Sequence, residues 1–548
     1  RKLQYTHGYG AIMAPANAVT NEGKPDFVTR NIPPESIGGA PPLDTQPRIY
    51  YGRGTGSYVV VNTDQREIDY QRLDGSNVES TYQGKGGVRM GSLFRRAAFA
   101  LRFGDINPLI SGLIRPSSRA MFIRDIGSRV RTAAPFLRYD ADPYPVVVKG
   151  RLLWVQDAYT TTSRYPYSAN ADLNGIPGAS GLRGGVSYIR NSVKVVIDAY
   201  DGTTTFYLFD DKDPLARAYG RAFPGLFTSA DRMDPELRSH LRFPEDLFRV
   251  QTNMYGRYHI TRSDDFYNAA DAWNVSQDPG SGSPSAELQV TATTNAQGLQ
   301  VGAARVRRMD PAYLLMRLPN EQQESFLILR PFVPVSGGDK QKELTAFMTA
   351  KSDPNDYGKV QVFVMPRGLH IDGPSLVDSR IAADADISKE ISLLNTQGSQ
   401  VLLGNVLIVP IEQSILYVRP LYVQSQRSPF PELKRVIVVY AGKAAMRPTL
   451  QDALAAVFGS APPTREQAPT TGPSPAPTTG PAVSTGVTQL LDQAKAAFDQ
   501  AQADLRNGDL AAYQKDNQRG VDLVNEARGQ AGSGAPSTTT TAPSQGTA

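Results

Sequence analysis

The chain has 548 residues, 40% of them hydrophobic and 20% charged, which is typical of a folded globular protein of about two to four domains. It contains no cysteine, so disulfides and thiolate metal sites are excluded. The net charge is +5, and the basic excess lies before residue 461, because the remainder is mildly acidic. No window reaches the roughly 18 uncharged apolar residues that a membrane-spanning helix needs. Since the first residue is Arg1 and no signal peptide precedes it, we expect the chain to be a portion of a longer protein.

The first half of the chain alternates between strand and helix signals. Residues 1–83 are rich in Gly, Pro and Tyr with short strand signals, residues 84–138 favour helices, and residues 139–214 return to strands. The clearest element is the hairpin Tyr188–Pro214, in which alternating Val and Ile residues precede Asp201-Gly202. An Asp-Gly pair between two such runs predicts a two-residue hairpin turn.

The second half begins with helical signals and continues with strands. Prolines interrupt the helices expected over residues 215–275, and a Gly, Pro and Ser-rich loop follows at 276–285. Strand composition then recurs at Phe326–Pro331, Lys359–Met365, Gln400–Val409, Ile415–Val423 and Arg435–Tyr440. A helix over Thr449–Phe458 closes this region.

These signals predict an α+β fold with two mainly antiparallel, β-rich subdomains and interspersed helices. We expect the first subdomain, with its arginine-rich helices, over residues 1–275 and the second over residues 286–460. Residues 461–486 form a Pro/Thr-rich linker, which lacks the apolar residues of a core. Residues 487–528 have the apolar spacing of a helical hairpin, and residues 529–548 have the composition of a disordered tail.

The strongest electrostatic feature is the stretch Lys85–Arg138, where eleven Lys and Arg accompany two Asp. On a helical wheel Met90, Leu93, Phe94, Ala97 and Leu101 share one side, whereas Phe99 and Phe103 lie on the basic side as potential wedges. A basic amphipathic helix favours an anionic surface such as lipid headgroups. We therefore predict binding to an anionic surface by Lys85, Arg89, Arg95, Arg96, Arg102, Arg119 and Arg124. The alternative is a solvated helix face that pairs with acids elsewhere, such as Asp210, Asp211 and Asp213.

Two further patterns carry weaker chemical signals. The turn Gly84–Gly87 precedes the basic helix and would offer backbone N–H groups to a phosphate, although it lacks the Lys-Ser/Thr pair of a P-loop and a plain turn is the alternative. Aspartates around the hairpin would supply oxygen ligands to Ca²⁺, or else serve as turn and capping residues: Asp198, Asp201, Asp210, Asp211 and Asp213. No cofactor is predicted, and no nucleic-acid-binding motif accompanies the basic stretch.

Several segments resemble one protein family. They include YTHGYG at 5–10, PRIYYG at 47–52, YQGKGGV at 82–88, RDIGSRVRTAAPFLRYDADPYPVV at 124–147 and LRFPEDLFRVQTNMYGRYH at 241–259. Over most of residues 1–458 the chain resembles the bacterial membrane proteins of uncharacterised protein family 0182, and its Arg and Ala usage resembles the actinobacterial members most. The resemblance implies a multi-span membrane region, absent from this chain, followed by a large extracytoplasmic domain. It brings no catalytic residues.

The sequence and the resemblance leave three functions open for a domain that we expect at the cell membrane, outside the cytoplasm. The first is a non-enzymatic envelope module that contacts anionic lipid, glycan or a protein partner. The second is an envelope hydrolase or transferase acting on glycan or lipid, in which the hairpin and the loop Asp157–Ser168 line a cleft with paired carboxylates. The third is a scaffold of a homo-oligomer or membrane complex that docks through the terminal helical hairpin.

Overall fold

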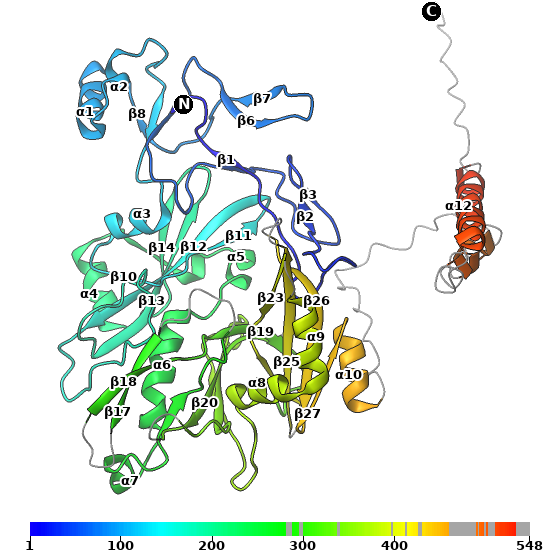
Figure 1. Ribbon diagram of the computed structural model, residues 1–548. Coiled ribbons are helices and arrows are strands. Elements are labelled where there is room, and N and C mark those ends of the chain that lie inside the picture. Colours follow the sequence, from blue (N-terminus) through cyan, green and yellow to red (C-terminus); the bar gives the residue numbers. More distant parts are fainter. Residues whose placement is uncertain are drawn as a thin grey trace, which may run out of the picture. The chain divides into compact units, whose positions relative to one another are not determined.

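The computed structural model describes residues 1–280, 288–294, 300–336, 340–395, 398–411, 414–425 and 430–459 and, near the C-terminus, 489–490, 493–497, 500–501 and 510–532 (Figure 1). The chain divides into two compact units, Arg1–Pro463 and Thr464–Ala548. The larger unit combines helices with several mostly antiparallel sheets, which confirms the predicted α+β fold.

The first large sheet contains the predicted hairpin. Its strands run in the order β10-β12-β13-β14-β15, with β11 also paired to β12, and only β14 and β15 are parallel. The strands are β10 (Arg138–Tyr139), β11 (Tyr144–Val148), β12 (Arg151–Thr162), β13 (Tyr188–Asp198), β14 (Thr204–Leu208) and β15 (Phe227–Ser229). β13 and β14 pair as predicted, with Ile197 opposite Thr204.

The turn of this hairpin is longer than the predicted two residues. Residues 199–203 separate the two strands, because the carbonyl of Ala199 accepts hydrogen bonds from the backbone N–H groups of Tyr50 and Tyr51. Gly202 has φ +67°. A Cβ at this position would lie 2.4 Å from the ring of Tyr51, so only glycine fits.

Two further sheets make up the second β-rich region. One has the order β16-β20-β21-β22 with β19 paired to β20, and the other has the order β23-β25-β26-β27 with β24 paired to β25; both are antiparallel. The expected strand Gln400–Val409 is in fact two strands, which pair with successive halves of β25. The strands are β16 (Trp273–Val275), β19 (Ala312–Met316), β20 (Ser325–Pro334), β21 (Ala346–Lys351), β22 (Val360–Val364), β23 (Ser399–Leu403), β24 (Leu407–Ile411), β25 (Ser414–Ser425), β26 (Glu432–Tyr440) and β27 (Lys443–Arg447).

Smaller ladders complete the β structure. A three-stranded sheet has the order β5 (Val59–Val61), β9 (Arg119–Met121) and β8 (Val88–Arg89). Two-stranded ladders pair β1 (Gly8–Tyr9) with β4 (Arg48–Ile49), β2 (Thr29–Arg30) with β3 (Glu35–Ser36), β6 (Glu67–Gln71) with β7 (Asn77–Ser80), and β17 (Leu288–Thr294) with β18 (Gln300–Arg307).

The helices fall largely where prolines and caps place them. The prediction of helices throughout residues 84–138 is only partly right, because β8 and β9 lie within that stretch. Thr449 caps the predicted closing helix through its side chain. The helices of the larger unit are α1 (Leu93–Phe103), α2 (Asn107–Ile110), α3 (Ile126–Ala133), α4 (Pro214–Ala222), α5 (Pro235–Ser239), α6 (Glu245–Tyr258), α7 (Ser263–Tyr267), α8 (Pro374–Ala383), α9 (Ala385–Leu394) and α10 (Leu450–Phe458).

The hydrophobic core crosses the expected subdomain boundary at residues 276–285. One buried cluster joins Tyr159 and Phe248 to Phe332 and Met348, which lie on opposite sides of that boundary in the sequence. A second cluster packs α8 and α9 against β25 and β26. The two-subdomain division stays a prediction.

The smaller unit contains helix α12 (Leu510–Gly532), which extends beyond residue 528, the predicted end of the helical hairpin. Residues 493–497 are also helical, within the first helix expected for the hairpin. Residues 502–509 within the expected hairpin, the linker 461–486 and the tail beyond residue 532 lie outside the described residues.

Candidate functional site

The predicted basic helix forms a small lobe. We use the name α1–α2 lobe for residues 88–121, which run from β8 through α1 and α2 to β9 and lie at one end of the larger unit (Figure 1). Helix α1 begins because the Ser92 side chain accepts a hydrogen bond from the Arg95 N–H, and it ends at Gly104 with φ +59°. None of its residues is fully buried.

The packed side of α1 is the opposite of the predicted one. The ring of Phe103 stacks on Tyr58 with centroids 3.9 Å apart, and Phe99 stacks on Phe103 at 5.4 Å. Both phenylalanines pack on a core that includes Val60 and Met90. The prediction that Phe99 and Phe103 are outward wedges is therefore wrong. Met90 precedes the helix, which begins only at Leu93, so it does not set the helix face that packs inward.

The other side of α1 exposes large apolar side chains. Leu93, Phe94 and Leu101 are 71%, 83% and 87% exposed, and Ile106 and Ile110 of the adjoining segment are also exposed. Single exposed apolar residues are common on proteins, but a group of this kind marks an interaction site for a membrane or a protein.

The seven cations of the predicted site divide into two groups. Arg96, Arg119 and Arg124 donate hydrogen bonds to backbone carbonyls, so they hold loops of the fold together. Arg124 is buried, with its guanidinium bonded to the carbonyls of Thr6, Tyr50 and Ser57. These three side chains have structural roles.

The other four cations reach solvent: Lys85, Arg89, Arg95 and Arg102. Of these, Arg95 also donates a hydrogen bond to the Arg89 carbonyl at 3.5 Å. Within the described residues, no carboxylate forms an ion pair with any of the four. Asp105, which lies just after α1, pairs instead with Lys2 and Tyr58. The hydrogen bonds from Tyr58, Asn107 and Lys2 lower the pKa of Asp105.

The aspartates of the hairpin act as turn and capping residues. Asp198 accepts hydrogen bonds from the N–H groups of Tyr200 and Asp201, and Asp210 pairs with Arg190. Asp213 caps α4 and accepts from Thr160, Ser192 and Tyr188. Burial opposes ionisation of Asp213, but these hydrogen bonds outweigh it and lower its pKa. Asp211 is exposed.

The calcium site around these aspartates stays a prediction. In the part of the chain that the structure describes, no group of three or more His, Asp or Glu is arranged to hold a metal ion. The ion pairs expected in the alternative, from the basic stretch to Asp210 or Asp213, are not formed, because both carboxylates have the partners given above.

The Gly84–Gly87 turn meets the hairpin loop. Lys85 N–H donates to the Asp201 carboxylate, and Gly86 N–H donates to the Tyr82 hydroxyl, which itself donates to Asp201. A Cβ at Gly86 would lie 2.3 Å from the Asp201 carbonyl, so the glycine allows this close approach. Because these two N–H groups already have partners, the segment is a packed turn and not a backbone phosphate cradle.

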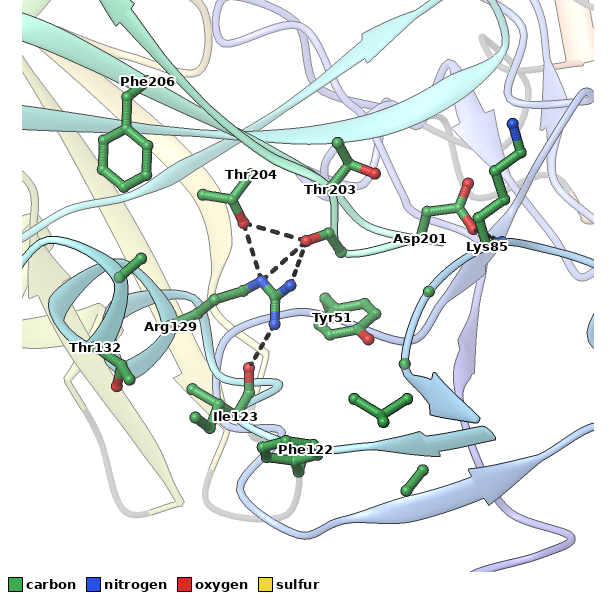
Figure 2. Close-up of a pocket in the computed structure, with 16 residues that line it drawn as sticks. Tyr51, Lys85, Phe122, Ile123, Arg129, Thr132, Asp201, Thr203, Thr204 and Phe206 are labelled. Atoms are coloured by element: carbon green, nitrogen blue, oxygen red, sulfur yellow. Dashed lines mark hydrogen bonds between the residues drawn. The ribbon is translucent and has the colours of Figure 1, made fainter. Parts of the chain in front are cut away.

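A cavity of about 560 Å³ lies beside this turn, between α3 and the hairpin loop (Figure 2). Figure 2 shows the guanidinium of Arg129 against the ring of Tyr51, 4.7 Å from its centroid, with hydrogen bonds to Ile123, Gly202 and Thr204. The sequence marked Arg129 only as one of eleven cations. No local pattern distinguishes it from its neighbours.

A buried polar network lies under β12 and β13. The ammonium of Lys194 contacts the Asp157 carboxylate and the Tyr357 hydroxyl, and Asp140 accepts from Tyr159 at 2.5 Å. Burial and the neighbouring carboxylates of Asp246 and Asp157 raise the pKa of Asp140. Asp157 is therefore a core residue of β12 and does not line the cleft expected at Asp157–Ser168.

A smaller cavity of about 200 Å³ holds the carboxylates of Asp384, Asp386 and Glu390. Asp384 caps α9 by accepting from the Ile387 N–H, and Glu390 bonds to Arg435. Two of the three carboxylates thus stabilise the fold. Catalysis by paired carboxylates stays a prediction.

The chain belongs to the uncharacterised protein family UPF0182, whose family model matches residues 1–394. It is 40% identical over 530 residues to a UPF0182 protein of Moorella thermoacetica, covering 96% of this chain and 54% of that relative. The UPF0182 protein of Sulfurovum sp. is 42% identical over 461 residues, covering 84% of this chain and 46% of that relative. A UPF0182 protein of Cupriavidus necator is 40% identical over 511 residues, covering 93% and 51%.

The chain spans about half the length of the curated relatives it matches. No solved structure matches it. Among the helices of the described residues, none combines the length and the apolar composition needed to cross a membrane.

Proposed function

We propose that this member of UPF0182 is a non-enzymatic binding module of the cell envelope, and that its α1–α2 lobe contacts an anionic membrane surface. One observation carries the proposal. Exposed Leu93, Phe94 and Leu101 lie on the same short helix as Arg95 and Arg102, which form no ion pair with a carboxylate among the described residues. The proposed setting is the outer side of a cytoplasmic membrane, in a longer protein of actinobacterial type with membrane-spanning segments.

The lobe has the chemistry of a helix that lies in the membrane interface. Such a helix buries its apolar side chains about 5–10 Å into the boundary between headgroups and acyl chains, while cations stay at the headgroups. Phe99 and Phe103 anchor α1 to the rest of the unit through Tyr58 and Phe122. The outward side chains are thus held in place before any contact with lipid, which reduces the entropy lost on binding.

The test is flotation of the chain with vesicles of phosphatidylglycerol and of phosphatidylcholine across a salt series. We expect binding to the anionic vesicles that weakens as salt screens the arginines. Each arginine near an anionic surface contributes roughly 1 kcal/mol, so Arg95→Gln with Arg102→Gln should weaken binding about 30-fold. The matched control replaces Arg131 and Arg138, which are exposed outside the lobe, and should leave binding unchanged.

A second pair of variants tests the apolar contact. Phe94→Ser with Leu101→Ser should weaken binding by at least about 100-fold, because burying each large apolar side chain contributes roughly 1.5–3 kcal/mol. Phe94→Trp places a fluorescent reporter on the lobe, and its emission should shift to shorter wavelength with anionic vesicles. Equal binding to both kinds of vesicle, or equal losses in the Arg131 and Arg138 control, would contradict the proposal.

A further inference from the structure

The cavity beside α3 is a second site, distinct from the exposed face of the α1–α2 lobe. Its volume of about 560 Å³ is within the range of about 300–1,000 Å³ that small-molecule sites occupy. Its walls come from four separate parts of the chain: Tyr51, residues 85–88, residues 120–133 and residues 201–206. Figure 2 shows Arg129 between Thr204 and Tyr51 on one side of this space.

Arg129 is a half-buried cation whose protein partners are all neutral. Its Nε donates to the Gly202 carbonyl at 2.9 Å and to the Thr204 hydroxyl at 3.0 Å, and its Nη1 donates to the Ile123 carbonyl at 3.2 Å. Burial lowers the pKa of Arg129, and among the described residues no carboxylate forms an ion pair with it. A charge removed from water without a counter-charge is costly, so the site favours an anion.

The guanidinium retains donors for such an anion. It carries five N–H groups, two of them on each terminal nitrogen. Nη1 uses one on Ile123 and Nη2 uses one on Gly202, at 2.5 Å. One N–H therefore remains on each terminal nitrogen for a further acceptor, such as an oxygen of a carboxylate or phosphate.

The surrounding backbone holds Arg129 in position. Ile123, whose carbonyl accepts from Arg129, has φ +51°, a conformation that β-branched residues rarely adopt and that costs about 1–3 kcal/mol. Gly202, the other carbonyl partner, is fixed by the close approach of Tyr51. Strained residues of this kind gather at sites that bind ligands, where they hold donors in place.

The rest of the cavity is suited to a group that bears hydroxyls. Thr132, Thr203 and Thr204 line it, and Phe122 provides an apolar wall. Its lining also includes Lys85, which is exposed, and Asp201, whose carboxylate accepts from the Tyr82 hydroxyl and the Lys85 N–H. We propose that this cavity binds the phosphoryl group of a polyol phosphate, with Arg129 as its principal ligand. The same chemistry occurs in a soluble sugar or glycerol phosphate and in the headgroup of a glycerophospholipid.

The cavity adjoins the α1–α2 lobe without depending on it. Phe122 lines the cavity and also packs edge-on against Phe99 and Phe103 at 5.7 and 5.9 Å. A lipid headgroup in the cavity would therefore lie close to the proposed membrane contact. A soluble phosphate needs no membrane, so the two proposals can fail separately.

The test is calorimetric titration of the full chain with inorganic phosphate and with glycerol 3-phosphate. We expect glycerol 3-phosphate to bind, and Arg129→Gln to weaken its affinity at least tenfold. Arg131→Gln, on the exposed side of the same helix, is the matched control and should leave the affinity unchanged. Arg95→Gln with Arg102→Gln should also leave it unchanged, which separates this site from vesicle binding.

A second variant tests the cavity without removing Arg129, in case Arg129→Gln fails to fold. Ala133→Phe fills the cavity from an exposed wall position without touching the bonds of Arg129, and it should abolish binding while thermal unfolding stays unchanged. Phosphatidylglycerol vesicles that displace glycerol 3-phosphate identify a lipid headgroup as the source, and failure to displace identifies a soluble phosphate. The proposal is overturned if glycerol 3-phosphate does not bind. It is also overturned if Ala133→Phe leaves the affinity unchanged, or if Arg131→Gln weakens the affinity as much as Arg129→Gln does.

Discussion

The β12–β13 ladder contains a buried cation that is paired with a carboxylate, whereas the α1–α2 lobe carries cations that are exposed and have no carboxylate partner among the described residues. Lys194 lies in the middle of β13, directly opposite Asp157 in the register, and both side chains are buried with the hydroxyl of Tyr357 beside them. Arg95 and Arg102 reach solvent next to the exposed Phe94, and no carboxylate in the described residues pairs with them. A paired, buried cation stabilises the fold, whereas an unpaired cation beside exposed apolar groups is available to a partner. Counting charges along the sequence does not separate these two cases.

The largest expected effect tests the buried side of this comparison. Lys194→Met leaves the Asp157 carboxylate buried without a cation, so we expect the free energy of unfolding in urea to fall by about 3–5 kcal/mol. The control Arg95→Gln should change it by less than about 0.5 kcal/mol, because that side chain is exposed. Replacing both partners, Lys194→Met with Asp157→Leu, should recover part of the loss. A fully stable single variant would contradict a structural role for the pair.

A smaller effect distinguishes the two sides of α1 itself. Phe103→Ala removes a ring that stacks on Tyr58 and packs near Phe122, so it should destabilise the unit by about 2 kcal/mol. Phe94→Ala removes an 83% exposed ring and should cost less than about 0.5 kcal/mol. Thermal unfolding of the two variants measures both values. Equal losses would mean that Phe94 also packs in the fold, and the outward face would then not be free to bind.

The sequence predicted those elements whose signals are local. Alternating apolar residues placed β13 and β14, and Thr449 with its following apolar run placed α10. Turn and capping chemistry likewise anticipated the alternative roles of Asp198 and Asp213. These features depend on neighbouring residues alone, so one sequence is enough to find them.

The lobe and the cavity could not be predicted because they depend on distant residues. Both sides of α1 carry large apolar side chains, and residues outside the helix, such as Tyr58 and Phe122, determine that Phe103 packs inward. Arg124 and Arg129 belong to one run of arginines, yet their carbonyl partners lie at Thr6 and Gly202. Periodicity and spacing carry no information about such partners.

His7 and Asp69 are a third kind of charged group, because their ionisation in a buried site makes the stability of the fold depend on pH. Burial lowers the pKa of His7, but hydrogen bonds with Asp69 and Glu67 outweigh it and raise the pKa above 6.5. The stabilisation from protonated His7 is therefore complete below pH 6.5 and is lost as the pH rises through the folded-state pKa. For Asp69, burial raises the pKa, but bonds from His7 and Arg48 outweigh it and lower the pKa, so its contribution is lost at acid pH.

The free energy of unfolding between pH 5 and pH 9 measures this contribution. His7→Gln should flatten the alkaline decline, whereas His370→Gln, at an exposed position, should leave the decline unchanged. Burial and Asp246 also raise the pKa of Asp140, so ionisation of this carboxyl likewise lowers the stability of the fold as the pH rises. The informative quantity is therefore the difference in unfolding free energy between each variant and the wild type. An unchanged decline in His7→Gln would assign the effect to the carboxyls whose pKa burial raises, which include Asp140, Asp246 and Asp278.

The smallest expected effect concerns the choice of arginine at position 95. Ser92 caps α1 by accepting from the Arg95 N–H, and a Glu at that third helical position would complete a capping box and oppose the positive end of the helix dipole. Arg95→Glu should therefore stabilise the unit by about 0.3–1 kcal/mol. Arg102 lies in the last turn of α1, where a cation is favourable, so Arg102→Glu should destabilise it by a similar amount.

The same two substitutions should both weaken binding to vesicles. Both variants replace a cation of the lobe with an anion, so both should lose affinity for phosphatidylglycerol vesicles although their stabilities change in opposite directions. That result would mean that the protein has Arg at position 95, although Glu would make α1 more stable, because the arginine serves a contact outside the fold. If affinity followed stability in the two variants, the arginines of the lobe would belong with Lys194 as structural charges.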